Sequence, residues 1–120
     1  EVTEIVLLDS EEEIQKAIHP LKKYYSGLFS PIKSFEIQNE IFFEVFGQDV
    51  SKGKAAQFLA DYFQVSLQNT LFIGDSYNDE EIMDLVGYPV AMGNAVEEVK
   101  TKARMITKTN NEAGVAWAIH

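Results

Sequence analysis

The chain has 120 residues, 46% of them hydrophobic, a formal net charge of −9 at pH 7 and no cysteine. This composition supports a folded core, and it excludes disulfide scaffolds, cysteine-ligated zinc and cysteine nucleophiles, while the acidic balance argues against nucleic-acid and anionic-membrane partners. No apolar run approaches the roughly 18 residues of a membrane-spanning helix and the start lacks a signal-peptide pattern, so a cytoplasmic protein is expected.

The first part of the chain has the pattern strand, helix, strand, strand. Residues 5–8 form a short apolar run that is long enough for one strand. Ser10 and Glu13 have the spacing of a capping box, which predicts the start of a helix, and Pro20 predicts a kink or a break within it. Two alternating stretches then predict a pair of strands: residues 35–37 and 41–45.

The second part alternates helices with strands, and a loop at residues 47–50 separates it from the first. Strands are predicted at residues 70–73, 90–92 and 105–107, and helices at residues 51–64, 79–86, 95–103 and 114–119. The first helix is amphipathic, with an apolar stripe at helical spacing: Ala55, Phe58, Leu59, Tyr62 and Phe63. Gly87 is expected to close the second helix, and Trp117 to lie in a core stripe with Val115 and Ile119. The alternation predicts an α/β fold with a parallel sheet.

The strongest chemical signal follows the predicted strand at residues 70–73. Gly74 and Asp75 come directly after this strand, and Asn78 and Asp79 lie where the next helix begins. Ligands of α/β proteins bind at the carboxyl ends of parallel strands, and carboxylate and amide oxygens suit Mg²⁺. Helix capping explains Asn78 and Asp79 equally well, but it does not explain Asp75.

A second signal lies at the start of the helix over residues 51–64. Lys52 and Lys54 lie where the helix dipole disfavours cations, and Gly53 lowers helix propensity. An anion bound between the helix N-terminus and a lysine would remove this conflict, although two solvated surface lysines explain it as well. Gly93 and Asn94 are interpreted as a simple turn and helix cap.

Taken together, these segments resemble the carboxyl-terminal half of a haloacid dehalogenase (HAD) superfamily phosphatase of the Cof type, which carries a large α/β cap. The matching stretches are residues 50–55, 74–79, 90–95 and 114–116. The resemblance implies half of a Rossmann-like parallel sheet with helices in residues 49–120. It also implies the carboxyl-terminal half of the cap, a β-α-β-β segment, in residues 1–48.

The resemblance further implies a Mg²⁺-dependent phosphomonoester hydrolase that acts on small phosphorylated metabolites through an aspartyl-phosphate. Lys52 would be a catalytic residue that holds the phosphate. Asn78 would bind the phosphoryl oxygens, Asp75 would ligate Mg²⁺, and Asp79 would act in catalysis by supporting the metal waters or by orienting Lys52.

The chain departs from the family because it lacks the D-x-D-G-T motif that carries the nucleophile and the acid/base. Asp9 also follows an apolar strand, but the motif that starts at Asp9 is D-x-E in place of D-x-D, and no Gly-Thr follows. The chain is therefore expected to be a fragment that is inactive alone. The alternative is a non-catalytic module that binds Mg²⁺ or phosphate or serves in assembly. The absent strands would leave residues 70–73 as an exposed sheet edge, which predicts a homo-oligomer through that edge.

Overall fold

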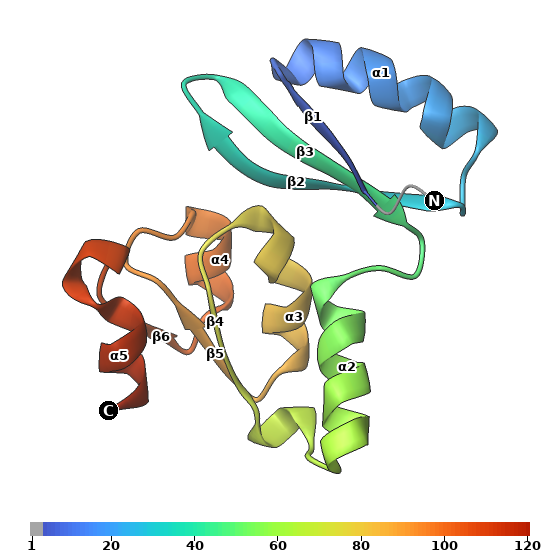
Figure 1. Ribbon diagram of the computed structural model, residues 1–120. Coiled ribbons are helices and arrows are strands. Elements are labelled where there is room, and N and C mark those ends of the chain that lie inside the picture. The colour runs from blue at the N-terminus through green and yellow to red at the C-terminus, as the bar shows by residue number, and fades with distance from the viewer. Residues whose placement is uncertain (1–3) are drawn as a thin grey trace. The chain divides into compact units, whose positions relative to one another are not determined.

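The computed structural model describes residues 4–120 and divides the chain into two compact units, Glu1–Ser51 and Lys52–His120 (Figure 1). Residues 1–3 of the predicted cap segment lie outside the described residues, and the identification of the first unit as a cap remains a prediction. No helix within residues 4–120 has the length and hydropathy that a bilayer crossing requires.

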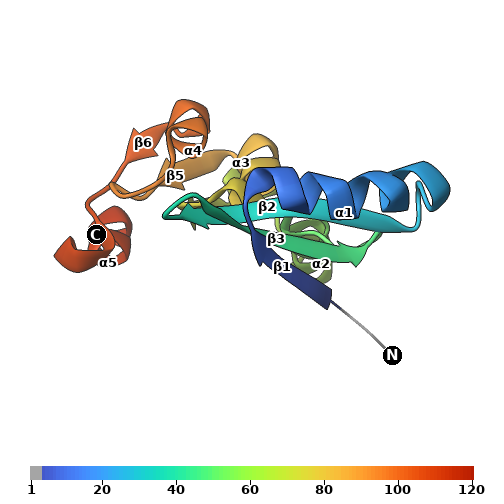
Figure 2. The same ribbon diagram turned by 90° about the horizontal axis from the view of Figure 1, so that it is seen from above.

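The first unit is a helix packed on a three-stranded antiparallel sheet. Its elements are β1 (Glu4–Asp9), α1 (Glu11–Tyr24), β2 (Phe29–Ile37) and β3 (Glu40–Gly47), and the strands lie in the order β1-β3-β2. The predicted element order is thereby confirmed. The helix α1 lies over one face of the sheet, as Figure 2 shows, and the core between them is made by Ile14, Ile18, Ile41, Phe43 and Val45.

The structure tests two local predictions for α1. The capping box predicted at Ser10 does not form, because Asp9 Oδ1 accepts the Ser10 N–H at 2.7 Å and Glu13 pairs instead with Lys16 Nζ at 2.7 Å. At Pro20 the sequence predicts a kink or a break, and the helix continues through this residue to Tyr24 without a break. Proline removes one backbone donor, and the packing of α1 against the sheet compensates for that loss.

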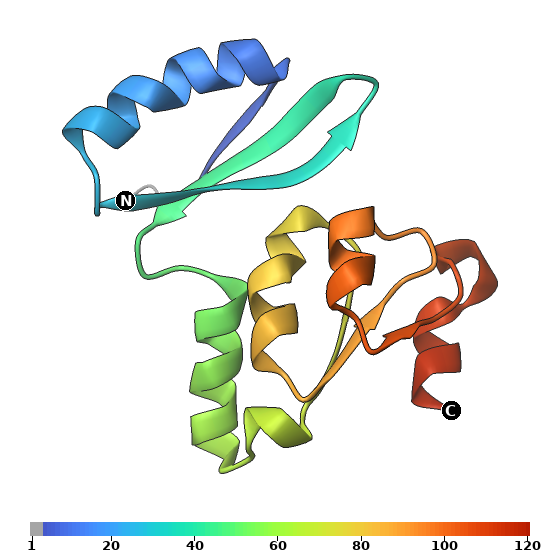
Figure 3. The same ribbon diagram turned by 180° about the vertical axis from the view of Figure 1, so that it is seen from behind.

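The second unit is built on a three-stranded parallel sheet in the order β4-β5-β6, which confirms the α/β fold class. Its main elements are α2 (Lys52–Phe63), β4 (Leu71–Gly74), α3 (Glu80–Leu85), β5 (Tyr88–Ala91), α4 (Glu97–Lys102), β6 (Met105–Ile106) and α5 (Gly114–Ile119). Three 3₁₀ turns join them: η1 (Leu67–Asn69), η2 (Tyr77–Asp79) and η3 (Asn110–Glu112). The helices α2, α3 and α4 lie side by side, as Figure 3 shows. The core is formed by Met83, Ala91, Met92, Ala95 and Val99.

In two helices of the second unit, α2 and α5, the buried face carries small residues and the large apolar side chains are exposed. In α2 the buried residues are Gly53 and Ala60, and the aromatic stripe is exposed. A Cβ atom at Gly53 would lie 2.7 Å from the Glu81 side chain, so α2 approaches α3 through its small residues.

The core stripe predicted in α5 is also wrong. Val115, Trp117 and Ile119 are all exposed, and Gly114 is the buried residue of this helix. A Cβ atom at Gly114 would lie 2.0 Å from the carbonyl oxygen of Lys108. The start of α5 therefore packs through its backbone, and its large apolar side chains stay exposed.

Candidate active site

The loop after β4 begins with a close approach that requires glycine. Gly74 is the buried last residue of β4, and a Cβ atom there would lie 2.8 Å from Cβ of Asp79. The 3₁₀ turn η2 brings Asp79 back to this point, at the carboxyl end of the strand. Sequence and backbone thus place Asp75 and Asp79 at the same edge of the parallel sheet.

Asp79 is the centre of the contacts in this loop. Its Oδ2 accepts the backbone N–H groups of Asp75 at 2.9 Å and Ser76 at 3.2 Å, and its Oδ1 forms an ion pair with Lys52 Nζ. The Asp79 side chain is only 5% exposed. A buried carboxylate is tolerated when it is paired and hydrogen-bonded, and these three partners meet that requirement.

Lys52 reaches this carboxylate from the first turn of α2. Its Nζ also donates to Asn78 Oδ1 at 3.1 Å, and its side chain is 48% exposed. The ion pair with Asp79 offsets the unfavourable position of a cation at a helix N-terminus. The second irregularity of this turn, Gly53, is explained by the contact between α2 and α3, so it is no evidence for an anion.

Asp75 differs from Asp79 in its surroundings. Its residue is exposed, and its backbone oxygen accepts the N–H of Val96 at 3.0 Å. The structure thus brings Lys52, Asn78 and Asp79 into direct contact, and it ties Asp75 to Asp79 through the backbone. No group of three or more His, Cys, Asp or Glu side chains within residues 4–120 has the arrangement of a metal cage. In the described loop after β4, Asp75 provides one exposed carboxylate that a cation could reach.

The loop at residues 93–96 contributes a neighbour that the sequence reasoning missed. Asn94 was interpreted as a cap, but its Oδ1 accepts the backbone N–H of Asn110 at 2.8 Å and therefore joins two loops. Because Val96 also binds the Asp75 backbone, this loop holds the carboxyl edge of the sheet from a second side. No local pattern reveals these contacts, since the partners are far apart in the chain.

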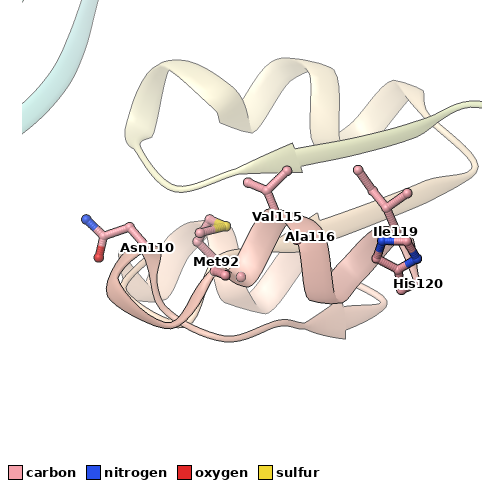
Figure 4. A pocket seen from close by; sticks show the side chains of 8 residues that line it. Met92, Asn110, Val115, Ala116, Ile119 and His120 are labelled. Carbon is pink, nitrogen blue, oxygen red and sulfur yellow. The ribbon is translucent and has the colours of Figure 1, made fainter.

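Two other features are described separately. Asp9 ends β1 in the antiparallel sheet of the first unit, where its carboxylate binds the Ser10 backbone. A hollow of about 590 Å³ lies beside α5 in the second unit, and its wall includes Met92 and Ile119 (Figure 4). None of Lys52, Asp75, Asn78 and Asp79 lines this mainly apolar hollow.

Comparison with known families decides what kind of protein carries this cluster. Residues 1–119 match the haloacid dehalogenase-like hydrolase family. The chain belongs to this family. The resemblance inferred from the four stretches of sequence is thereby confirmed.

Individual relatives agree with this assignment. M6_Spy0533 of Streptococcus pyogenes is 33% identical over 119 residues, which cover 99% of this chain and 43% of that protein. The 5-amino-6-(5-phospho-D-ribitylamino)uracil phosphatase YwtE of Bacillus subtilis is 40% identical over 76 residues, which cover 63% of this chain and 27% of that protein. A haloacid dehalogenase-like hydrolase structure from B. subtilis superposes with a TM-score of 0.80 at 30% identity, covering 95% of this chain and 38% of its own. The chain spans less than half the length of these proteins.

Proposed function

We propose that Lys52, Asp75, Asn78 and Asp79 form part of the phosphate and Mg²⁺ site of a Cof-type phosphomonoester hydrolase. The contact between Lys52 and Asp79 carries the proposal, because it joins residues 27 positions apart at the carboxyl edge of a parallel sheet. A lysine held there provides a fixed positive charge. Phosphoryl transfer depends strongly on such charge and on accurate positioning of the reacting groups.

Each residue has a distinct role in this proposal. The Lys52 ammonium binds a phosphoryl oxygen and stabilises the charge that develops there during transfer. Asp79 orients Lys52 through the ion pair and holds the loop through its two backbone contacts. Asn78 accepts from Lys52 with its oxygen, so its amide N–H₂ is the group that donates to the phosphoryl group. Of the four residues, Lys52 and Asn78 touch the substrate, and Asp79 is a positioning residue.

The residues fit Mg²⁺ as a site with few protein ligands. Both oxygens of Asp79 are engaged by N–H donors, whereas Asp75 is exposed at the end of β4. Mg²⁺ commonly binds through one or two carboxylates and keeps several waters. Asp75 would therefore be the ligand in this chain. A bound Mg²⁺ ion would neutralise part of the negative charge on the phosphoryl group.

We further propose that the complete enzyme works through an aspartyl-phosphate whose nucleophile is not among these 120 residues, and that it acts in the cytoplasm. This chain is then a fragment without activity of its own. The name of YwtE describes a phosphatase of a phosphorylated ribityl compound, which supports a small phosphorylated metabolite as the substrate class. Among the strands of residues 4–120, β4 pairs with β5 alone, and this open edge supports self-association. The alternative, a non-catalytic module that binds Mg²⁺ or phosphate, rests on the absent D-x-D-G-T motif.

Phosphate binding tests the role of Lys52. In the presence of Mg²⁺, we expect Lys52→Gln to weaken the binding of inorganic phosphate about tenfold, because a charge-assisted hydrogen bond is lost. Lys54→Gln removes the same charge two residues away, and we expect less than about a twofold change because exposed charges are screened. Calorimetric titration of both variants provides the comparison. Equal effects of the two substitutions would contradict the proposal.

A phosphatase assay on the same protein tests whether these 120 residues are inactive alone. We expect no release of p-nitrophenol from p-nitrophenyl phosphate above a buffer blank. Turnover that disappears in Asp9→Asn would show that Asp9 is a nucleophile and that the assignment of β1 to a cap is wrong.

A further inference from the structure

The loop after β5 is fastened to the loop after β6 at the carboxyl edge of the parallel sheet. We call residues 92–96 the β5 loop and residues 107–113 the β6 loop. A Cβ atom at Gly93 would lie 2.9 Å from a backbone nitrogen of the β6 loop, so the two backbones are in close contact. Asn94 adds a side-chain contact, because its Oδ1 accepts the N–H of Asn110 at 2.8 Å. The position of the β5 loop therefore depends on the β6 loop.

The β6 loop is a firm support, because it is closed on itself by hydrogen bonds. The Thr107 side chain belongs to a buried residue, and its hydroxyl donates to the carbonyl of Gly114 at 2.7 Å. Thr109 and Glu112 form a capping box around η3. The Gly114 N–H donates to the carbonyl of Thr109 at 3.0 Å. A segment with these contacts is expected to hold its shape, so it provides a fixed reference for its neighbour.

The β5 loop in turn holds the backbone of Asp75. The Val96 N–H donates to the carbonyl of Asp75 at 3.0 Å, and the N–H of Asp75 donates to Asp79 Oδ2 at 2.9 Å. The backbone of Asp75 is thus held at both its N–H and its C=O. Since the direction of a Cα–Cβ bond follows from the backbone, these two hydrogen bonds determine the direction in which the exposed Asp75 side chain leaves the loop.

Helix capping does not explain Asn94. The helix α4 begins at Glu97, and its N-cap residue is Val96. The Asn94 oxygen accepts instead from Asn110, which is 16 positions away in the chain. Removal of the Asn94 side chain therefore breaks a contact between two loops.

We infer that Asn94 is a positioning residue for Asp75, the proposed Mg²⁺ ligand. Asn94 fastens the β5 loop to the β6 loop, and Val96, two residues later, passes that restraint to the Asp75 backbone. Mg²⁺ requires nearly ideal octahedral geometry, and residues behind a ligand tune the affinity of a metal site by orienting that ligand. Asn94 acts through other residues and needs no contact with the ion or the substrate. The part of this inference that concerns Mg²⁺ rests on the proposed function.

Hydrogen exchange of the 120-residue chain, measured by nuclear magnetic resonance, tests the restraint without any metal. The N–H of Val96 reports on the bond to Asp75, and the N–H of Gly87, which donates to Leu67 at 2.8 Å, is the internal reference. We expect Asn94→Ala to raise the ratio of the Val96 exchange rate to the Gly87 exchange rate about fivefold, the size that loss of one ordinary hydrogen bond allows. A general loss of stability would raise both rates together.

Two further variants control for the substitution itself. Asn94→Asp keeps an acceptor oxygen at the same place, and it should restore the ratio to within about twofold of the parent. Asn110→Ala also removes a side-chain acceptor, but that oxygen binds the N–H of the adjacent Asn111 at 3.0 Å, so the ratio should change less than about twofold. An unchanged ratio in Asn94→Ala, an equal rise in Asn110→Ala, or no recovery in Asn94→Asp would overturn the inference.

Titration with Mg²⁺ separates this inference from the proposed function. We expect Asn94→Ala to raise the dissociation constant for Mg²⁺ about threefold, because a site with one carboxylate has little binding energy to lose, and Asn110→Ala to leave it unchanged. Parent-like affinity in Asn94→Ala would overturn the role of Asn94 at the metal site. If the parent shows no binding that depends on Asp75, the proposed metal site fails, and the exchange ratio alone then supports or overturns the positioning of Asp75 by Asn94.

Discussion

Replacing Gly87 with alanine is expected to destabilise the second unit by about 3–5 kcal/mol. A Cβ atom at this position would lie 1.8 Å from the carbonyl oxygen of Gln68, and the Gly87 N–H donates to the carbonyl of Leu67 at 2.8 Å. The atoms that this Cβ would meet belong to the Gln68 backbone, so no side-chain rotation relieves the overlap. Chemical denaturation followed by circular dichroism measures the loss of free energy of unfolding.

Gly47→Ala provides the control for this prediction. Its Cβ atom would meet only Val50 Cγ2, at 4.0 Å, which is an ordinary van der Waals contact. We expect a change within about 0.5 kcal/mol. A Gly87→Ala variant whose stability differs from the parent by less than about 1 kcal/mol would show that the contact between η1 and Gly87 is looser than the structure has it.

Replacing Asp79 with alanine is expected to cost about 2–3 kcal/mol. The substitution leaves the N–H groups of Asp75 and Ser76 without their acceptor and removes the partner of Lys52. Lys52 is half exposed and regains water, so most of the cost comes from the two backbone donors. Thermal unfolding of the variant should show a lower midpoint, and the amide signals of residues 75–79 should shift most.

Asp84→Ala is the matched control for Asp79. Asp84 pairs with Lys102 Nζ at 2.7 Å, but its side chain is 59% exposed. Exposed ion pairs contribute little, so we expect a change within about 0.5 kcal/mol. If the two substitutions cost the same, the account of Asp79 as the centre of this loop fails.

The secondary structure could be predicted because periodicity is a local property. The alternation of strands and helices after residue 50 was sufficient to predict the parallel sheet. What periodicity does not reveal is which apolar face is covered. The stripe that contains Phe58 and Tyr62 identifies a face of α2, but the small residues Gly53 and Ala60 decide which face packs on α3. Burial depends on the neighbouring helix, and the sequence of one helix does not describe its neighbour.

The candidate site could be predicted in part because three of its residues lie close together in the sequence. Asp75, Asn78 and Asp79 are close in sequence, so their proximity follows from one loop. Their contact with Lys52 was inferred from the resemblance alone. The helix α3 ends just before Gly87, as the sequence predicts, but the φ of Gly87 is not in the left-handed region and its close contact is with Gln68. Close approaches between distant backbone segments leave no local pattern.

Titration with Mg²⁺, followed by the amide signals of the chain, tests the proposed site most directly. We expect shifts centred on residues 75–79 with a dissociation constant on the order of millimolar, because a single carboxylate provides little binding energy for a strongly hydrated ion. Asp75→Ala should abolish these shifts, and Asp84→Ala should leave them unchanged. Micromolar affinity, or shifts that persist unchanged in Asp75→Ala, would contradict the assignment of this loop as the metal site.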